Sequence, residues 1–209
     1  FGDVALMHLG THTAGGFPIQ VPENIKTEQQ LLAYLKAWKP SYKAGTHRSY
    51  ANPSIGMLGY ITAKAMGKGF DSAMQDTLFP ALGLKNTFTT VPKAKMADYA
   101  QGYKRTGEPA RMTPAILSSE AYGVRSTADD MIHFVNANMG LEKLDGKIQQ
   151  AIINTHTGYF SVGAMTQDMI WEQYAYPAAL KTLTDANSGA LLKTVPVSEI
   201  SPPMKPRQD

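Results

Sequence analysis

A proline at position 53 fixes the start of one helix in this chain and restricts the residue before it. Proline is favoured in the first turn of a helix, because the N–H group that it lacks has no partner there. The residue before a proline is biased away from helical backbone angles, so Asn52 is the expected N-cap of a helix from Pro53 to about Met66. Tyr50 lies two residues earlier, so a phenol and a carboxamide are expected close together at the start of this helix.

Apolar residues recur at helical spacing through most of the chain, and strand-like segments follow. Helices are predicted at 3–13, 28–39, 53–66, 71–79, 126–139 and 144–155, the second after a capping box that begins at Thr27. Short strands are predicted at 86–91 and 99–104, a long surface loop at 102–119, further strands beyond Gly158, and an extended exit after Leu191. Helices first and strands later predict an α+β fold. Gly56 and Gly59 weaken their helix, which predicts close contact with another element.

The composition excludes several classes of protein. With 209 residues, of which 43% are hydrophobic and 18% charged, the chain can bury a substantial core. The net charge of +3 comes from scattered basic residues, which disfavours nucleic-acid binding. There is no cysteine, so disulfides and thiol nucleophiles are excluded. No apolar run is long enough to span a bilayer, and the start at Phe1 is expected to result from truncation or processing.

Two histidines have a spacing that zinc sites use. His8 and His12 lie four residues apart and would share one helix face. No glutamate lies between them in the metalloprotease pattern and no third ligand is evident, so no metal site is predicted.

Tyr50 could transfer protons only in a suitable environment. A tyrosine phenol has a pKa of about 10 and acts as a base at neutral pH only where cations stabilise the phenolate. Lys43 and Arg48 are close in sequence, but a short connector is expected to point them outward. Asn52 could hold a substrate amide, and Gln20 lies in a turn-rich loop that could bring an amide donor to the substrate. In the alternative interpretation, Asn52 only caps a helix, Tyr50 only packs beside it, and the loop is an ordinary turn.

The nucleophile that these side chains would serve is not evident. Ser-x-x-Lys, Lys-Thr-Gly and Gly-x-Ser-x-Gly are all absent from the sequence. The nearest approaches to Lys-Thr-Gly are 181–183 and 193–195, where a branched residue replaces the glycine that permits close backbone approach.

Several segments in order along the chain resemble the class C β-lactamases, and the resemblance covers nearly all of the sequence. The segments are Thr11–Gln20, Ala44–Arg48 leading into Tyr50–Gly56, Phe79–Leu84, Glu120–Ser126 and Trp171–Glu172. Together they are more specific than any single motif, and they outweigh the purely structural interpretation of Tyr50 and Asn52. The resemblance implies the serine β-lactamase and penicillin-binding-protein-like fold, mainly its helical domain with part of the antiparallel sheet region.

The resemblance also implies a function. It implies a periplasmic hydrolase of β-lactam antibiotics, chiefly cephalosporins, that forms a serine acyl-enzyme, acts on this small-molecule substrate and uses no metal or cofactor. Tyr50 matches the proton-transferring tyrosine of the family, and Asn52 matches the asparagine that binds the amide of the β-lactam side chain. Gln20 matches the glutamine of the adjoining loop, and Tyr122 matches the tyrosine of the long loop that walls the pocket.

The chain departs from the family in two motifs. The serine and first lysine of the family would precede Phe1, and its Lys-Thr-Gly strand would follow Asp209. Residues 1–209 are therefore expected to be an incomplete domain, with a helical region at about 1–155 and a strand-rich region and exit segment at about 156–209, and the isolated chain is expected to be inactive. The alternatives are a penicillin-binding D-alanyl-D-alanine peptidase or an esterase of the same fold, or a non-catalytic fragment or binding module.

Overall fold

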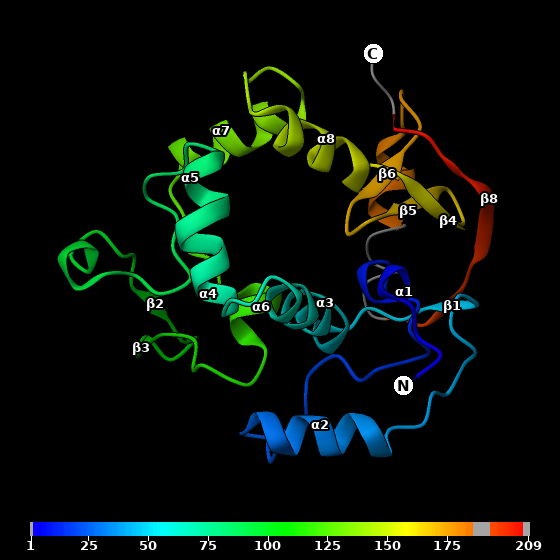
Figure 1. The fold of residues 1–209 in the computed structure, drawn as a ribbon, viewed down its shortest axis with the longest axis horizontal. Helices are drawn as coiled ribbons and strands as arrows, with labels where there is room; N and C mark the ends of the chain where they lie inside the picture. The colour runs from blue at the N-terminus through cyan, green and yellow to red at the C-terminus, as the bar shows by residue number, and fades with distance from the viewer. Residues whose placement is uncertain (1, 186–192, 207–209) are drawn as a thin grey trace.

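The computed structural model describes residues 2–185 and 193–206. Its helical elements are α1 (Leu6–Gly10), α2 (Glu28–Ala37), α3 (Asn52–Ala65), α4 (Phe70–Ala73), the π-helix η1 (Met74–Leu78), α5 (Phe79–Ala81), the 3₁₀-helix η2 (Lys93–Lys95), α6 (Ser118–Tyr122), α7 (Ala128–Asn138) and α8 (Gly146–Thr155). Its strands are β1 (His47–Arg48), β2 (Gly102–Tyr103), β3 (Pro109–Ala110), β4 (Gly158–Val162), β5 (Met165–Asp168), β6 (Glu172–Tyr174), β7 (Val195–Pro196) and β8 (Ser198–Met204). The helices form an arc from α3 through α4 and α5 to α7 and α8, and the sheet lies beyond α8 (Figure 1). The predicted α+β class is confirmed.

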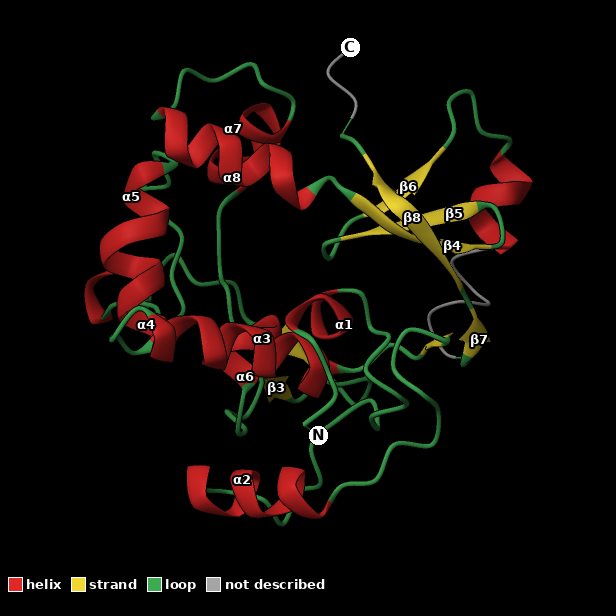
Figure 2. Ribbon diagram, turned by 45° about the vertical axis from the view of Figure 1, so that its right-hand side comes forward, coloured by secondary structure: helices red, strands yellow, loops and turns green. Residues whose placement is uncertain are grey.

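The main sheet has four antiparallel strands in the order β6-β5-β4-β8 (Figure 2). Between β4 and β8 the register shifts, so that Phe160 lies opposite Glu199 but Gly158 lies opposite Met204. Between these two pairs β8 has more residues than β4, and the adjacent Pro202 and Pro203 lie in this longer part, on the edge strand of the sheet. Their missing N–H groups cost no ladder hydrogen bond there. The prediction of an extended exit in place of a folded end is therefore wrong for 198–204, which form a strand.

Helix α2 follows the capping box that the sequence predicts. The Gln30 N–H donates to the Thr27 hydroxyl at 3.2 Å, and the Thr27 N–H donates to Gln30 Oε1 at 3.1 Å. The helix buries Leu31 and Leu35 in one apolar cluster with the loop after α1 and the start of α3. This cluster supports the region around position 50, because Ala51 belongs to it.

Helix α3 begins one residue earlier than predicted. It starts at Asn52, and its N-cap is Ala51, whose backbone is extended at φ −152° and ψ 124°. Asn52 is therefore not the N-cap, and no side chain caps this helix end. The Asn52 N–H donates instead to the carbonyl of Ile19 at 3.0 Å, so a contact with the preceding loop replaces the predicted cap.

Short helix α6 packs against the glycine face of α3. A Cβ atom at position 56 would lie 2.7 Å from the Cβ of Leu117, and one at position 59 would lie 2.9 Å from the Cβ of Glu120. The predicted close contact at the two glycines is confirmed.

The helix predicted at 71–79 is instead a chain of short pieces, α4, η1 and α5, and Pro80 lies inside the last one. The Phe79 N–H donates to the carbonyl of Met74, five residues earlier. This wider π turn leaves room for the proline ring, which would collide with the preceding turn of an α-helix. Pro80 therefore does not end the helical path.

The two short strands predicted before position 105 hardly form. Residues 86–91 contribute one isolated bridge, between Phe88 and Arg125. Of residues 99–104 only β2 is a strand, and its pairing with β3 places a small hairpin inside the predicted loop at 102–119. Alternating polarity predicts too many strands here, because a segment with this pattern forms a strand only where another strand pairs with it. No helix among the described residues is long and apolar enough to cross a membrane.

Candidate active site

Tyr50 lies between β1 and α3 at a half-buried position, neither in the core nor fully exposed. The loop after α1 holds this segment from one side. The centroid of the His12 ring lies 4.6 Å from that of the Tyr50 ring, and the backbone N–H groups of Ser49 and Ala51 both donate to His12. The residues before and after Tyr50 are thus both hydrogen-bonded to His12, which fixes the backbone that carries the phenol.

A backbone hydrogen bond brings Asn52 and the residue before Gln20 together at the start of α3. Asn52 is half-buried at the first position of α3, and its N–H donates to the carbonyl of Ile19, the residue before Gln20. Gln20 is exposed. One phenol and two carboxamides therefore lie around the start of α3, a set that can donate and accept hydrogen bonds with an amide-containing ligand.

Tyr122 is connected to this corner less directly. It is half-buried and is the last residue of α6, which packs along α3 at Gly56 and Gly59. Among the described residues, no hydrogen bond or ring contact joins Tyr122 to Tyr50 or Asn52. The structure thus groups three of the four predicted site residues and places the fourth on the helix that covers α3.

Arg48 corrects an expectation about the cations near Tyr50. Its side chain is 1% exposed, whereas the sequence predicts that it points outward. Its Nε donates to Gln167 Oε1 at 2.6 Å, and its Nη2 pairs with Glu172 Oε1 at 2.6 Å. Burial lowers the pKa of Arg48, while the charges of Glu172, Tyr174 and Tyr50 oppose this change. A permanent positive charge is therefore buried two residues before Tyr50.

The partners of Arg48 explain why local sequence does not reveal its position. Gln167 lies on β5 and Glu172 on β6, which follow Arg48 by more than a hundred residues. β1, which contains Arg48, also pairs with β7. Strands from a much later part of the chain thus bury a side chain from the connector before α3.

The two histidines considered as zinc ligands do not share a helix face. α1 ends at Gly10, and His12 lies beyond it with a positive φ of 58°. The prediction of a shared face is therefore wrong, because α1 ends two residues before His12. Among residues 2–185 and 193–206, no group of three or more His, Cys, Asp or Glu side chains is arranged to hold a metal ion.

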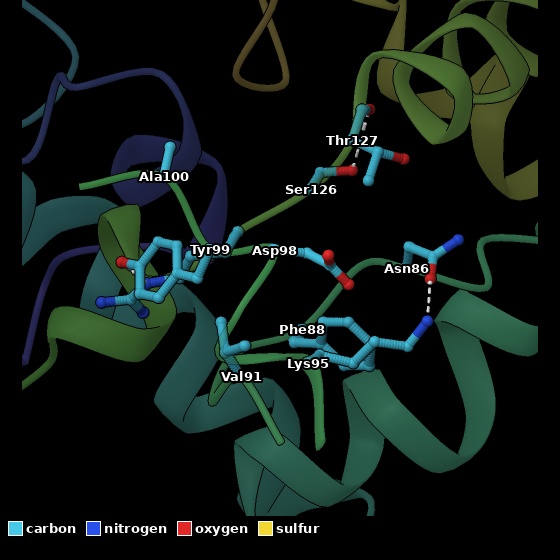
Figure 3. Close-up of a pocket in the computed structure, with 10 residues that line it drawn as sticks. Asn86, Phe88, Val91, Lys95, Asp98, Tyr99, Ala100, Ser126 and Thr127 are labelled. Atoms are coloured by element: carbon cyan, nitrogen blue, oxygen red, sulfur yellow. Dashed lines mark hydrogen bonds between the residues drawn. The ribbon is translucent and has the colours of Figure 1, made fainter. Parts of the chain in front are cut away.

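A cavity of about 460 Å³ opens elsewhere in the helical region (Figure 3). Phe88, Tyr99 and Ser126 line it, together with Arg125, whose Nε donates to the Tyr99 hydroxyl at 3.2 Å. None of the four predicted site residues lines this cavity. It is therefore separate from the corner at Tyr50.

Comparison with known proteins places the whole chain in one family. The sequence model of the family described as Beta-lactamase matches residues 1–196. A beta-lactamase from Lysobacter lactamgenus is 50% identical over 99% of this chain, and the match covers 54% of that protein. The chain thus spans about half the length of the curated relatives that it matches.

Solved structures agree with this assignment. A protein described as a beta-lactamase/D-alanine carboxypeptidase from Pseudomonas syringae has a TM-score of 0.95 at 52% identity, covering 98% of this chain and 57% of that one. A class C beta lactamase has a TM-score of 0.94 at 43% identity, covering 99% of this chain and 57% of that one. The serine β-lactamase-like fold that the sequence predicts, in partial form, is confirmed by these similarities. The chain belongs to the beta-lactamase family.

Proposed function

We propose that this chain is the central part of a class C serine β-lactamase that hydrolyses β-lactam antibiotics, chiefly cephalosporins, in the periplasm. The observation that carries the proposal is the convergence of Tyr50, Asn52 and the Gln20 loop at the start of α3. Residues 1–209 would form an incomplete domain, helical to about 155 and strand-rich from about 156.

The proposed reaction requires a proton to move from the serine hydroxyl to the nitrogen of the β-lactam ring. A serine hydroxyl attacks the β-lactam carbonyl, the C–O bond forms, the ring C–N bond breaks, and the hydroxyl proton must reach the ring nitrogen. Tyr50 would carry that proton, and water would then cleave the acyl ester. Arg48 places a buried positive charge on the same segment, two residues before Tyr50.

The carboxamides would orient the substrate. Asn52 would donate to the carbonyl of the side-chain amide that penicillins and cephalosporins carry, and Gln20, exposed beside it, would contact the same group. Tyr122 would offer an apolar ring to bulky substituents from the end of α6. Fixing the amide in this way raises the rate by holding the reacting carbonyl in place.

The nucleophile would come from outside residues 1–209, because these residues contain no Ser-x-x-Lys or Lys-Thr-Gly. The longer polypeptide, expressed with the coding sequence on both sides, should gain the mass of one cephalosporin on brief mixing and lose it on hydrolysis. The 209-residue chain alone should neither gain that mass nor hydrolyse a chromogenic cephalosporin. Hydrolysis by the isolated chain, or no covalent adduct on the longer protein, would contradict the proposal.

A D-alanyl-D-alanine peptidase is the second candidate function, because one of the similar structures is described as both a beta-lactamase and a D-alanine carboxypeptidase. The two activities differ in how fast water removes the acyl group. An acyl-enzyme that forms with penicillin and persists for hours, together with cleavage of a D-alanyl-D-alanine peptide, would support the peptidase.

A further inference from the structure

His12 occupies an unusual position for a histidine. It is 4% exposed, and its φ of 58° lies in the left-handed region, which non-glycine residues seldom adopt. Asparagine, aspartate and histidine tolerate this region better than other side chains, although it still costs energy. The surrounding structure must therefore hold His12 in place, and the contacts that do so involve the Tyr50 segment.

Three contacts join His12 to the residues around Tyr50. The Ser49 N–H donates to the His12 carbonyl at 2.9 Å, and the Ala51 N–H donates to His12 Nδ1 at 3.2 Å. Between these two bonds, the ring centroids of His12 and Tyr50 lie 4.6 Å apart with an interplanar angle of 37°. One histidine therefore holds the residues before and after Tyr50 and also packs against its ring.

The protonation state of His12 suits this role. Burial lowers the pKa of His12 to about 3, and the positive charge of Arg48 acts in the same direction. The imidazole is therefore neutral at neutral pH, and Nδ1, which accepts the Ala51 N–H, carries no proton. A neutral ring keeps the acceptor that holds Ala51 and adds no charge beside the phenol.

We propose that His12 is a positioning residue for Tyr50, which fixes the phenol in its reactive place by accepting the Ala51 N–H and packing against the Tyr50 ring. The proposal rests on the function proposed above, in which Tyr50 transfers a proton. It gives a role in the reaction to a histidine that the sequence analysis considers only as a zinc ligand.

Two substitutions separate the parts of this contact. His12→Asn keeps a hydrogen-bond acceptor close to the backbone and tolerates a positive φ, whereas His12→Phe keeps an aromatic ring but has no acceptor. His8→Asn is the matched control, because His8 Nδ1 accepts the Ala5 N–H at the same 3.2 Å but lies within α1, outside the proposed site.

In the longer protein, His12→Phe should lower kcat/KM for a chromogenic cephalosporin about 10-fold to 100-fold, because a small displacement of a catalytic group is costly. His12→Asn should recover most of that loss, and His8→Asn should leave the rate unchanged. In a Tyr50→Phe background, His12→Phe should cause no further loss, since its effect passes through the phenol. Equal losses in both backgrounds would show a merely structural role and overturn the proposal.

Hydrogen exchange tests the contact between His12 and Ala51 without relying on the proposed enzyme activity. In His12→Phe, the amide of Ala51 should exchange faster than in the parent protein, while it should stay protected in His12→Asn. Unchanged protection of Ala51 in His12→Phe would overturn the positioning role even if the enzyme were active. A parent protein that does not react with cephalosporins, yet loses Ala51 protection in His12→Phe, would overturn the proposed function while leaving the contact itself established.

Discussion

Arg48 keeps a positive charge inside the protein because two side chains of the sheet accept its hydrogen bonds. Arg48→Leu would leave Gln167 and Glu172 without this partner. Removing one member of a buried ion pair costs about 3 to 5 kcal/mol, and because a third of the Glu172 side chain is exposed, we expect the lower end, about 3 kcal/mol. Urea unfolding would measure this loss.

Arg105→Leu is the control for Arg48, because Arg105 is exposed in the loop between β2 and β3. It should change the free energy of unfolding by no more than about 0.5 kcal/mol. Similar losses in the two variants would mean that the buried hydrogen bonds of Arg48 do not stabilise the fold.

Asp168 makes stability depend on pH. It is 1% exposed, its Oδ1 has no hydrogen-bond partner among the described residues, and burial raises the pKa of this carboxyl to about 7. The folded state therefore retains the proton at pH values where the unfolded chain, with an ordinary pKa of 3.8, has lost it. The protonated form favours folding below about pH 4, and this contribution is lost as the pH rises towards 7.

Asp168→Asn should remove that pH dependence, because an amide has no proton to lose in this range. Melting temperatures between pH 4 and pH 8 should fall with pH in the parent more steeply than in the variant. Parallel curves for the two proteins would contradict the raised pKa of Asp168.

Residues near Tyr50 show what the sequence can and cannot predict at this scale. Family resemblance singled out Tyr50, Asn52 and Gln20, and the structure brings their backbones together. Arg48 and His12 were not predicted as parts of the site, because their burial depends on distant partners. Gln167 and Glu172 follow Arg48 by 119 and 124 positions, and no local pattern encodes that distance.

At the scale of elements, the packing of α6 on α3 depends on the missing side chains of two glycines. Gly56→Ala would gain about 1 kcal/mol of helix propensity, but its Cβ would lie 2.7 Å from the Cβ of Leu117. Because that neighbour is the rigid base of a side chain, we expect a net loss of about 1 to 3 kcal/mol in the free energy of unfolding. Thermal unfolding would measure it.

Gly146→Ala provides the comparison, since Gly146 begins α8 and no atom lies within 4 Å of an added Cβ. This variant should be neutral or slightly more stable. If Gly56→Ala were as stable as Gly146→Ala, the close packing of α6 on α3 would be refuted.

Local signals located the helices whose ends depend on nearby residues. Thr27 caps α2 through its own side chain, as the capping box predicts, and Thr127 caps α7, close to the predicted helix start at 126. The start of α3 and strand β8 were not predicted correctly, because each depends on another part of the chain: the Ile19 carbonyl for α3, and β4 for β8.

At the scale of the whole molecule, the helices and the sheet depend on each other. β1, before α3, pairs with β7, and Arg48 joins the same connector to β5 and β6. Late strands therefore help to fix the corner at Tyr50. Family membership was predictable because its segments are spread over nearly the whole chain, and the family match covers 1–196.

The rate of cephalosporin hydrolysis after Tyr50→Phe tests the central claim most directly. In the longer protein, removing this single hydroxyl should lower kcat by about 100-fold or more, as expected for loss of a proton-transferring group. Tyr60→Phe removes a hydroxyl that contacts Glu28 on α2 and should leave kcat unchanged. A Tyr50→Phe protein as active as Tyr60→Phe would contradict the assignment of proton transfer to Tyr50.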